Sequence, residues 1–375
     1  MPAAKAPEKR HRRLVCLRGT DEATRSRAYA IVEPLAGSDV LWVDGEWEAP
    51  GEFEAVGPSQ VRRHLGESYD AVVVSLHEDF DPNLLGQCHG FVWGGGVLVL
   101  RIPGPDKRPQ KLGRRLAAYP YGRADVGDRL WRRVESVLLG ACGDRLTPLS
   151  PTDHDICGTD EQRRIADKLA DRLTAAPPAC TVLMADRGRG KSSALGMAVA
   201  EVRQRLARAQ ASVIVTARYP EATTEVFRFA LGRDARPKEG PVCFASPARL
   251  LDESTSADVI VVDEASQLPV ATLRRLVEAY PDAHFIFATT THGYEGTGRG
   301  FSVRFLDWLE AQSRPVERLT MHEPIRWSSD DPVERAIFDA LLLDAEPAAI
   351  DIGDDVDVDG VVHRRLDRNS LASDN

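Results

Sequence analysis

Six consecutive residues that follow an apolar run have the types that bind phosphate groups: Gly188, Arg189, Gly190, Lys191, Ser192 and Ser193. The apolar run, 179–184, is typical of a buried strand, and a helix is expected to begin at the lysine. Glycines let backbone N–H groups turn inward on an anion, and the helix N-terminus adds its dipole. Lys191 would then reach the β- and γ-phosphates of a nucleotide, and the Ser192 hydroxyl would bind Mg²⁺. We therefore predict a P-loop over residues 185–192.

This P-loop departs from the strict pattern, which has glycine at the position of Ala185. The variant found here is typical of helicase-type ATPases. A chance Gly-Lys-Ser turn remains an alternative for the loop taken alone.

Two adjacent carboxylates, Asp263 and Glu264, end a second apolar run that begins at residue 258. An aspartate in this position holds Mg²⁺, usually through water, and the following glutamate can polarise the attacking water. Gln267 is placed to sense the γ-phosphate. Acidic residues after a strand are often only helix caps. Because the pair follows a P-loop by about seventy residues, a catalytic role is favoured.

Three further polar residues could contact a nucleotide or RNA. Gln162 begins a helix just upstream of the P-loop strand, and its two-sided amide could read the adenine edge, although a helix-surface glutamine is the alternative. Arg326, between Pro324 and Trp327, is a candidate arginine finger in cis. Arg299 lies in a glycine-rich loop, 292–300, that could couple nucleotide state to movement or touch RNA. An ordinary flexible turn is the alternative for that loop.

The elements around these residues predict two parallel α/β regions. The expected fold class is α/β, with an N-terminal Rossmann-like domain (1–145), a linker (146–158) and a RecA-like, helicase-type P-loop ATPase domain (159–344) before an acidic linker (345–375). The N-terminal strands are expected at 14–17, 40–43, 71–76 and 97–102, and its helices at 22–32, 58–65 and 128–139. In the second domain, helices are expected at 159–173, 221–231 and 270–279. Strands are expected there at 212–217, 241–245, 258–263 and 284–291.

The N-terminal region shows no reactive constellation. The side chains without the spacing of metal ligands are His64, His77, His89 and Cys88. The glycines 94–96 precede a strand and therefore predict a tight turn. We interpret this region as a docking or substrate-binding platform.

The amino-acid composition limits the classes of function that the chain can have. The chain has 375 residues and a formal net charge of −9, so no global basic field predicts nucleic-acid binding. The six cysteines form no C-x-x-C pair, which favours reduced thiols of a cytoplasmic protein. No signal peptide or membrane span is expected.

Four motifs occur together in the order of a known family: the P-loop, the carboxylate strand, the glycine stretch 293–301 and Pro-Ile-Arg-Trp (324–327). Together they closely resemble the tRNA(Met) cytidine acetyltransferase family over essentially the whole chain. The resemblance implies that Gln162, Gly188 to Ser192 and Arg326 contact ATP. It also implies a role in N4-acetylation of the wobble cytidine of elongator tRNA(Met).

One departure from the family changes the expected activity. In the family a GNAT-type acetyltransferase domain and a tRNA-binding tail follow the ATPase, whereas this chain stops at Asn375. We therefore expect an ATPase with Mg²⁺ and ATP, acetyl-CoA entering only through the missing domain, and no acetyl transfer by this chain alone. The alternatives are an ATP-binding scaffold that docks a separate acetyltransferase and a free-standing helicase, for which only one set of motifs is visible.

Overall fold

The fold is described from a computed structural model. The structure describes residues 10–345 except for 36–38, 46–52, 65–66, 106, 113–121, 123–124, 143–157, 206–210, 233–236, 238, 254–255 and 292–300. The glycine-rich loop with Arg299 lies outside the described residues. So do the predicted linkers 146–158 and 345–375, apart from residues 158 and 345.

The N-terminal region is built on a five-stranded sheet in which every neighbouring pair is parallel, in the order β1-β6-β4-β2-β3. Its strands are β1 (Arg13–Gly19), β2 (Val40–Val43), β3 (Glu54–Val56), β4 (Tyr69–Ser75) and β6 (Val92–Pro103). Continuous runs of valine and leucine form the central strands because both faces of a parallel sheet are covered. Short strands β5 (Asp79–Phe80) and β7 (Lys111–Leu112) pair separately.

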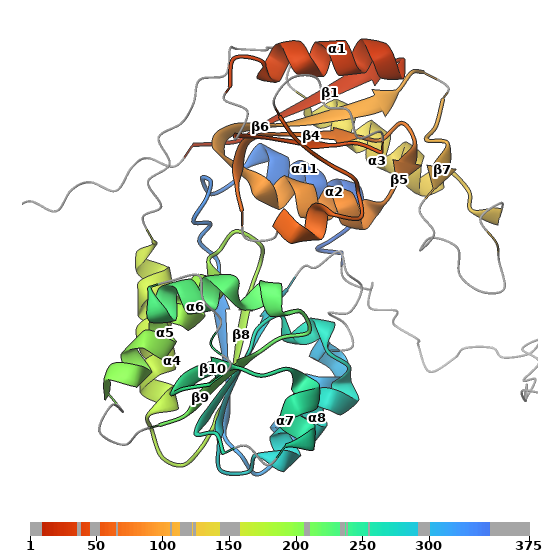
Figure 1. The fold of residues 1–375 in the computed structure, drawn as a ribbon. Coiled ribbons are helices and arrows are strands. Elements are labelled where there is room, and N and C mark those ends of the chain that lie inside the picture. The colour runs from red at the N-terminus through yellow and green to blue at the C-terminus, as the bar shows by residue number, and fades with distance from the viewer. Residues whose placement is uncertain are drawn as a thin grey trace, which may run out of the picture. The chain divides into compact units, whose positions relative to one another are not determined.

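Helices cover both faces of this sheet (Figure 1). Helix α1 (Asp21–Val32) packs on one face, and α2 (Pro82–Cys88), α3 (Arg129–Ala141) and α11 (Pro332–Leu341) pack on the other. Thr20 caps the N-terminus of α1, and its side chain accepts a hydrogen bond from the Ala23 N–H. The positions of α1 and α3 confirm the helices expected at 22–32 and 128–139.

Two N-terminal predictions are wrong. The helix expected at 58–65 is only a 3₁₀ turn, Val61–His64, preceded by a turn in which the Gln60 N–H bonds the Gly57 carbonyl. The glycines 94–96 lie within β6 and not in a turn before it, at an irregularity where the pairing with β4 shifts between Val92 and Val97 and Gly95 has a φ of 89°. Their small size serves close packing, since a Cβ on Gly94 would lie 2.6 Å from the Arg10 carbonyl oxygen and 2.9 Å from that of Arg326.

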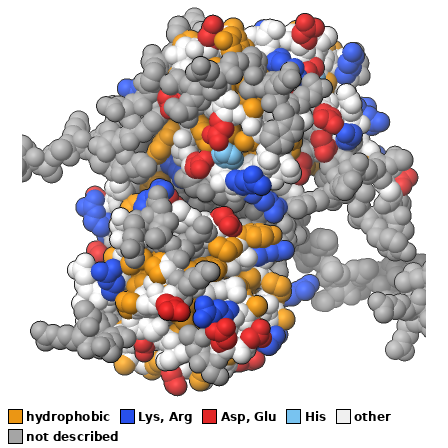
Figure 2. Space-filling view, viewed as in Figure 1, with side chains coloured by type: hydrophobic (Ala, Val, Ile, Leu, Met, Phe, Trp, Pro, Cys, Tyr) orange, Lys and Arg blue, Asp and Glu red, His pale blue; other side chains and the backbone are white. Residues whose placement is uncertain are grey.

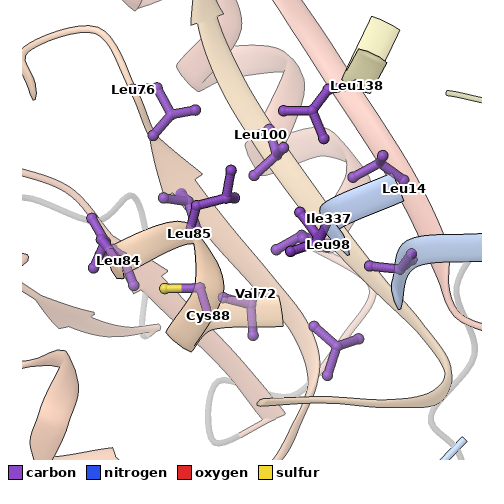
Figure 3. Packing of buried hydrophobic residues seen from close by; sticks show 14 of the residues in the cluster. Leu14, Val72, Leu76, Leu84, Leu85, Cys88, Leu98, Leu100, Leu138 and Ile337 are labelled. Carbon is purple, nitrogen blue, oxygen red and sulfur yellow. The ribbon is translucent and has the colours of Figure 1, made fainter. Parts of the chain in front are cut away.

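Helix α11 packs in the N-terminal core although it lies within the range predicted for the ATPase domain. Val333 and Ile337 are fully buried there. Figure 3 shows Ile337 in the same cluster as leucines of the sheet and of α3. Burial of a valine or isoleucine side chain contributes about 1.5–3 kcal/mol each, so these two alone hold α11 firmly to the N-terminal sheet.

The second sheet has six parallel strands in the order β10-β9-β11-β12-β8-β13, a RecA-like arrangement. Its strands are β8 (Cys180–Ala185), β9 (Val213–Thr216), β10 (Val242–Phe244), β11 (Val259–Val262), β12 (His284–Thr290) and β13 (Val316–Met321). Five of these match predicted strands, and β13 was not predicted. The P-loop strand β8 and the carboxylate strand β11 are separated by β12, so the ends of all three meet at one edge.

Two layers of helices enclose this sheet (Figure 1). One layer holds α4 (Asp160–Leu173), α5 (Lys191–Arg205) and α6 (Thr224–Leu231), and the other holds α7 (Pro247–Asp252), α8 (Val270–Ala279) and α10 (Leu306–Glu310). Apolar side chains that alternate along each strand enter the two layers in turn. No helix within the described ranges is long and apolar enough to cross a lipid bilayer.

Candidate nucleotide site

The P-loop connects β8 to α5 through two glycines with positive φ, Gly188 at +75° and Gly190 at +76°. Side chains would be strained in this conformation. Space is also lacking, because a Cβ on Gly188 would lie 2.2 Å from the Trp327 ring and one on Gly190 would lie 2.2 Å from Gln162 Nε2. The loop therefore adopts a tight backbone geometry that ends at the N-terminus of a 15-residue helix, α5.

Lys191 begins α5 and is buried. Its Nζ donates hydrogen bonds to Glu264 Oε1 at 2.9 Å and to Thr290 Oγ1 at 3.2 Å. An ammonium group carries three N–H donors, so these two bonds leave one donor for a further acceptor. Thr290, at the end of β12, also donates to Glu264 Oε2 at 3.3 Å and was not predicted from the sequence.

Ser192 and Asp263 meet across the same edge, with the serine hydroxyl donating to Asp263 Oδ2 at 2.7 Å. Asp263 is fully buried, and burial raises the pKa of its carboxyl to about 6 although the charge of Lys191 opposes the shift. A buried carboxylate beside a hydroxyl is a costly arrangement for stability alone. The two oxygen donors suit Mg²⁺, which prefers oxygen ligands.

Glu264 has a left-handed backbone, with φ 47° and ψ 47°. This conformation is uncommon for a residue with a side chain, and such strain is concentrated at functional sites. Burial acts to raise the pKa of its carboxyl, but the charges of Lys191 and Arg187 outweigh burial and lower it. Glu264 is therefore held ionised next to Asp263, whose Oδ1 accepts its N–H at 2.9 Å.

The two predicted glutamines differ in their contacts. Gln162 is buried, and its Nε2 donates to the Gly190 carbonyl at 2.9 Å, which places the amide against the P-loop. Gln267 lies one turn after Glu264, to whose carbonyl its N–H donates at 2.9 Å. The backbone carbonyl of Gln267 accepts from Arg218. The proposed roles of both glutamines toward a nucleotide stay predictions.

Arg326 contacts the N-terminal region. Its Nη1 donates to the carbonyls of Glu67 and Gly90, each at 3.2 Å, and its guanidinium lies 5.9 Å from the Trp93 ring. Burial lowers the pKa of Arg326 to about 10, and the nearby charge of Arg187 acts in the same direction while Glu225 opposes it. The guanidinium is thus close enough to the P-loop to feel Arg187, and its role toward ATP stays a prediction.

Arg189 is held by protein groups on the side of the loop that faces α11. Its guanidinium pairs with Glu334, its Nε donates to the His322 carbonyl at 3.1 Å, and its Nη1 donates to the Arg187 carbonyl at 2.8 Å. Sequence reasoning missed Glu334. The only signal in the sequence was that Glu334 lies seven residues after Trp327 of the Pro-Ile-Arg-Trp motif. The ring of Trp327 packs on Gly188.

The predicted site residues are thus brought together at the carboxyl edge of the second sheet, except that Arg326 reaches toward the N-terminal region. Among the residues that the structure describes, no group of three or more His, Cys, Asp or Glu side chains is arranged to hold a metal ion. A metal at this edge would therefore need ligands besides the protein carboxylates, such as water and phosphate oxygens.

Comparisons with known proteins agree with this architecture. The family model described as the N-terminal region of tRNA(Met) cytidine acetyltransferase TmcA matches residues 2–143. The model described as the helicase domain of RNA cytidine acetyltransferase NAT10/TcmA matches residues 182–344. The two matches coincide with the two sheets, except that the second includes α11.

Curated relatives match nearly the whole chain. A tRNA(Met) cytidine acetyltransferase TmcA of Nitrosococcus halophilus is 33% identical over 97% of this chain and 52% of its own length. Relatives of the same name from Haloarcula marismortui and Haloferax volcanii are each 34% identical, over 99% and 97% of this chain and 53% and 54% of their own length. The chain thus spans about half the length of the curated relatives it matches. It belongs to the tRNA(Met) cytidine acetyltransferase family.

Proposed function

We propose that this chain is the ATP-hydrolysing, helicase-like part of a tRNA(Met) cytidine acetyltransferase. In this proposal, ATP hydrolysis is coupled to N4-acetylation of the wobble cytidine of elongator tRNA(Met). The observation that carries the proposal is the hydrogen-bonded constellation of Lys191, Ser192, Asp263 and Glu264 at one edge of a parallel sheet. The names of the relatives supply the RNA substrate.

The residues of the constellation suit the triphosphate of ATP. The ammonium of Lys191 would exchange its bond to Glu264 for a phosphate oxygen, because a phosphate brings more negative charge than a carboxylate. The N–H groups of the P-loop and of the first turn of α5 would bind the remaining phosphate oxygens. Mg²⁺, held by Ser192 and by Asp263 through water, would neutralise charge on the β- and γ-phosphates.

Glu264 would act on the attacking water. Once Lys191 binds phosphate, the carboxylate loses its ammonium partner and becomes available to accept a proton. Before a nucleotide binds, the charges of Lys191 and Arg187 lower the pKa of the Glu264 carboxyl, so the side chain is already ionised when Lys191 leaves it. Gln267, one turn further on, is proposed to sense the γ-phosphate.

Arg326 is proposed to stabilise charge on the transferred phosphoryl group from its place near the P-loop. This role requires its guanidinium to leave the carbonyls of Glu67 and Gly90 or to reach the phosphate beside them. We expect Arg326→Ala to lower kcat at least about tenfold and to change the ATP dissociation constant less. Steady-state kinetics with binding titrations checks this, and equal losses in both quantities would reduce Arg326 to a ground-state contact.

Acetyl transfer is assigned to a different part of the enzyme. In the proposal acetyl-CoA is bound by a GNAT-type acetyltransferase domain, supplied in cis or in trans, and the RNA is shared between that domain and this chain. On the face drawn in Figure 2, lysine and arginine side chains are interspersed with acidic ones, so we assign no RNA-binding patch to that face.

The test is phosphate release from ATP by the purified chain, with and without elongator tRNA(Met). We expect Mg²⁺-dependent turnover in the wild type. Glu264→Gln should keep nucleotide binding and lose about 100-fold or more in kcat, the usual contribution of a general base. If the wild type binds ATP but releases no phosphate under either condition, the chain is an ATP-binding scaffold and the hydrolytic role is wrong.

A further inference from the structure

Arg189 and Glu334 form a buried ion pair between the P-loop and α11. Two roughly parallel bonds join them, Nη1 to Oε1 and Nη2 to Oε2, the second at 3.2 Å. Their side chains are only 10% and 12% exposed. Bidentate pairs of this kind fix orientation as well as distance, and weak solvent screening makes them stronger than surface pairs.

Arg189 is well placed to control the shape of the loop. It lies between Gly188 and Gly190, which both have positive φ and carry no side chain to resist a change of conformation. Since glycine gives the backbone its greatest freedom, the geometry of this loop depends on contacts made by its neighbours. Outside its own loop, Arg189 forms a charged contact with Glu334.

Glu334 is itself held by Trp327 and Asp331, and both of these residues contact Arg12 of the N-terminal region. Trp327, fully buried, donates from Nε1 to Glu334 Oε2 at 3.4 Å. The Arg12 guanidinium stacks on the Trp327 ring at 3.6 Å and pairs with Asp331 at 2.9 Å, with neither charged side chain exposed. Asp331 in turn caps α11 by accepting the Glu334 N–H at 2.9 Å.

The position of Glu334 therefore follows the N-terminal core. Val333 and Ile337, on the same helix, are fully buried in that core. A continuous set of contacts runs from the N-terminal sheet through α11 to the P-loop, with Glu334 as its last member.

We propose that Glu334 is a positioning residue for the P-loop, and that it makes nucleotide affinity depend on the N-terminal core. The inference rests on the proposed function, because it takes the P-loop as an ATP site. Without the carboxylate, the buried Arg189 guanidinium keeps no charged partner on α11, and the loop relaxes into conformations that present its N–H groups less well. The N-terminal region thus serves as part of the support of the nucleotide site.

The first experiment compares two carboxylates of α11 that each pair with an arginine. Glu334→Gln should weaken Mg·ATP binding about tenfold, as measured by isothermal titration calorimetry. Asp339→Asn breaks the exposed pair with Arg133, in which the aspartate is 61% exposed, and should leave affinity unchanged. In steady-state kinetics Glu334→Gln should raise KM with little change in kcat, which a general loss of folded protein would not do.

A double-mutant cycle assigns the effect to the pair. Arg189→Gln tests the same contact from the loop side and removes no group from the N-terminal core. Because Arg189→Gln also removes the bonds to the His322 and Arg187 carbonyls, the double variant Arg189→Gln/Glu334→Gln should bind Mg·ATP about as weakly as Arg189→Gln alone.

Unchanged affinity in Glu334→Gln, or losses that simply add in the double variant, would overturn the inference. Should Glu334→Gln fail to fold, as judged by thermal unfolding, Arg189→Gln decides alone, and wild-type affinity in that variant would overturn it. Failure of the wild type to bind Mg·ATP would refute the proposed function instead, so the two failures are distinguishable.

Discussion

Both parallel sheets have buried charged side chains at their carboxyl edges, but these side chains are paired differently at the two edges. At the N-terminal edge, the fully buried Arg101 pairs with both Asp44 and Asp21 and donates to Thr24 Oγ1. At the other edge, two carboxylates lie side by side and Lys191 bonds only one of them directly, Glu264.

This difference in pairing indicates which of the two sheet edges is suited to bind a ligand. In the N-terminal cluster the guanidinium of Arg101 has carboxylate partners on both Nη groups, and Arg25 pairs with the same two carboxylates, so the two positive and two negative charges balance within the fold. At the second edge the pKa of Asp263 is raised and Glu264 has a strained backbone, both of which cost stability. A loss of stability that the surrounding fold does not offset is typical of functional sites. The parallel α/β architecture is shared, and the edge residues distinguish the two regions.

The largest expected effect on stability is at the N-terminal edge. Arg101→Met should lower the free energy of unfolding by about 3 kcal/mol or more, because it removes the direct bond to the buried Asp44 and leaves that carboxylate the longer contact with Arg25 at 3.8 Å. Urea unfolding measures the loss, and Arg101→Met/Asp44→Asn should recover part of it. A single variant as stable as the wild type would show that this cluster is not structural, and the contrast between the edges would fail.

A change of opposite sign is expected at the second edge. Burial raises the folded-state pKa of Asp263 from 3.8 to about 6, so the folded protein holds that proton more tightly than the unfolded chain. The unfolding free energy therefore falls as pH rises through this window, and the penalty persists at pH 7. Without nucleotide or Mg²⁺, Asp263→Asn should be more stable than the wild type at neutral pH, by about 3 kcal/mol at most.

Unfolding measured across that pH window checks the sign. The gain in Asp263→Asn should shrink toward the acid end, where the wild-type carboxyl is already protonated. A variant that is less stable than the wild type at pH 7 would mean that the ionised carboxylate stabilises the fold, as the charges of the N-terminal edge do.

The smallest expected effect is at Gln162. One N–H of its amide already bonds the Gly190 carbonyl, which leaves the other N–H and Oε1 for a base edge. Gln162→Ala should weaken ATP binding about tenfold and reduce the preference for ATP over GTP. If the affinities for both nucleotides fall equally, Gln162 acts only by supporting the P-loop and the adenine role is wrong.

The parts that could be predicted from the sequence are those encoded locally. The P-loop, the strand that ends in Asp263 and most helices have their signals within one short segment, and the structure confirms their positions. The supports of the loop could not be predicted in this way. Trp327 and Glu334 lie more than 130 residues from Gly188 and Arg189, and their contacts exist only because α11 returns to the N-terminal core. The glycines 94–96 were misinterpreted for the same reason, since the backbone that crowds Gly94 belongs to Arg10 and Arg326.

The central claim, that the edge at Lys191 is an Mg·ATP site, is tested most directly by calorimetric titration of Mg·ATP into wild type and Lys191→Ala. Lys168→Ala is the matched control, because Lys168 pairs with Glu317 in an exposed position on α4. We predict saturable binding by the wild type and by the control, and a loss of at least about 100-fold in affinity for Lys191→Ala, since the phosphate charge then has no ammonium partner. Equal affinities in all three proteins would contradict the assignment of this edge as the nucleotide site.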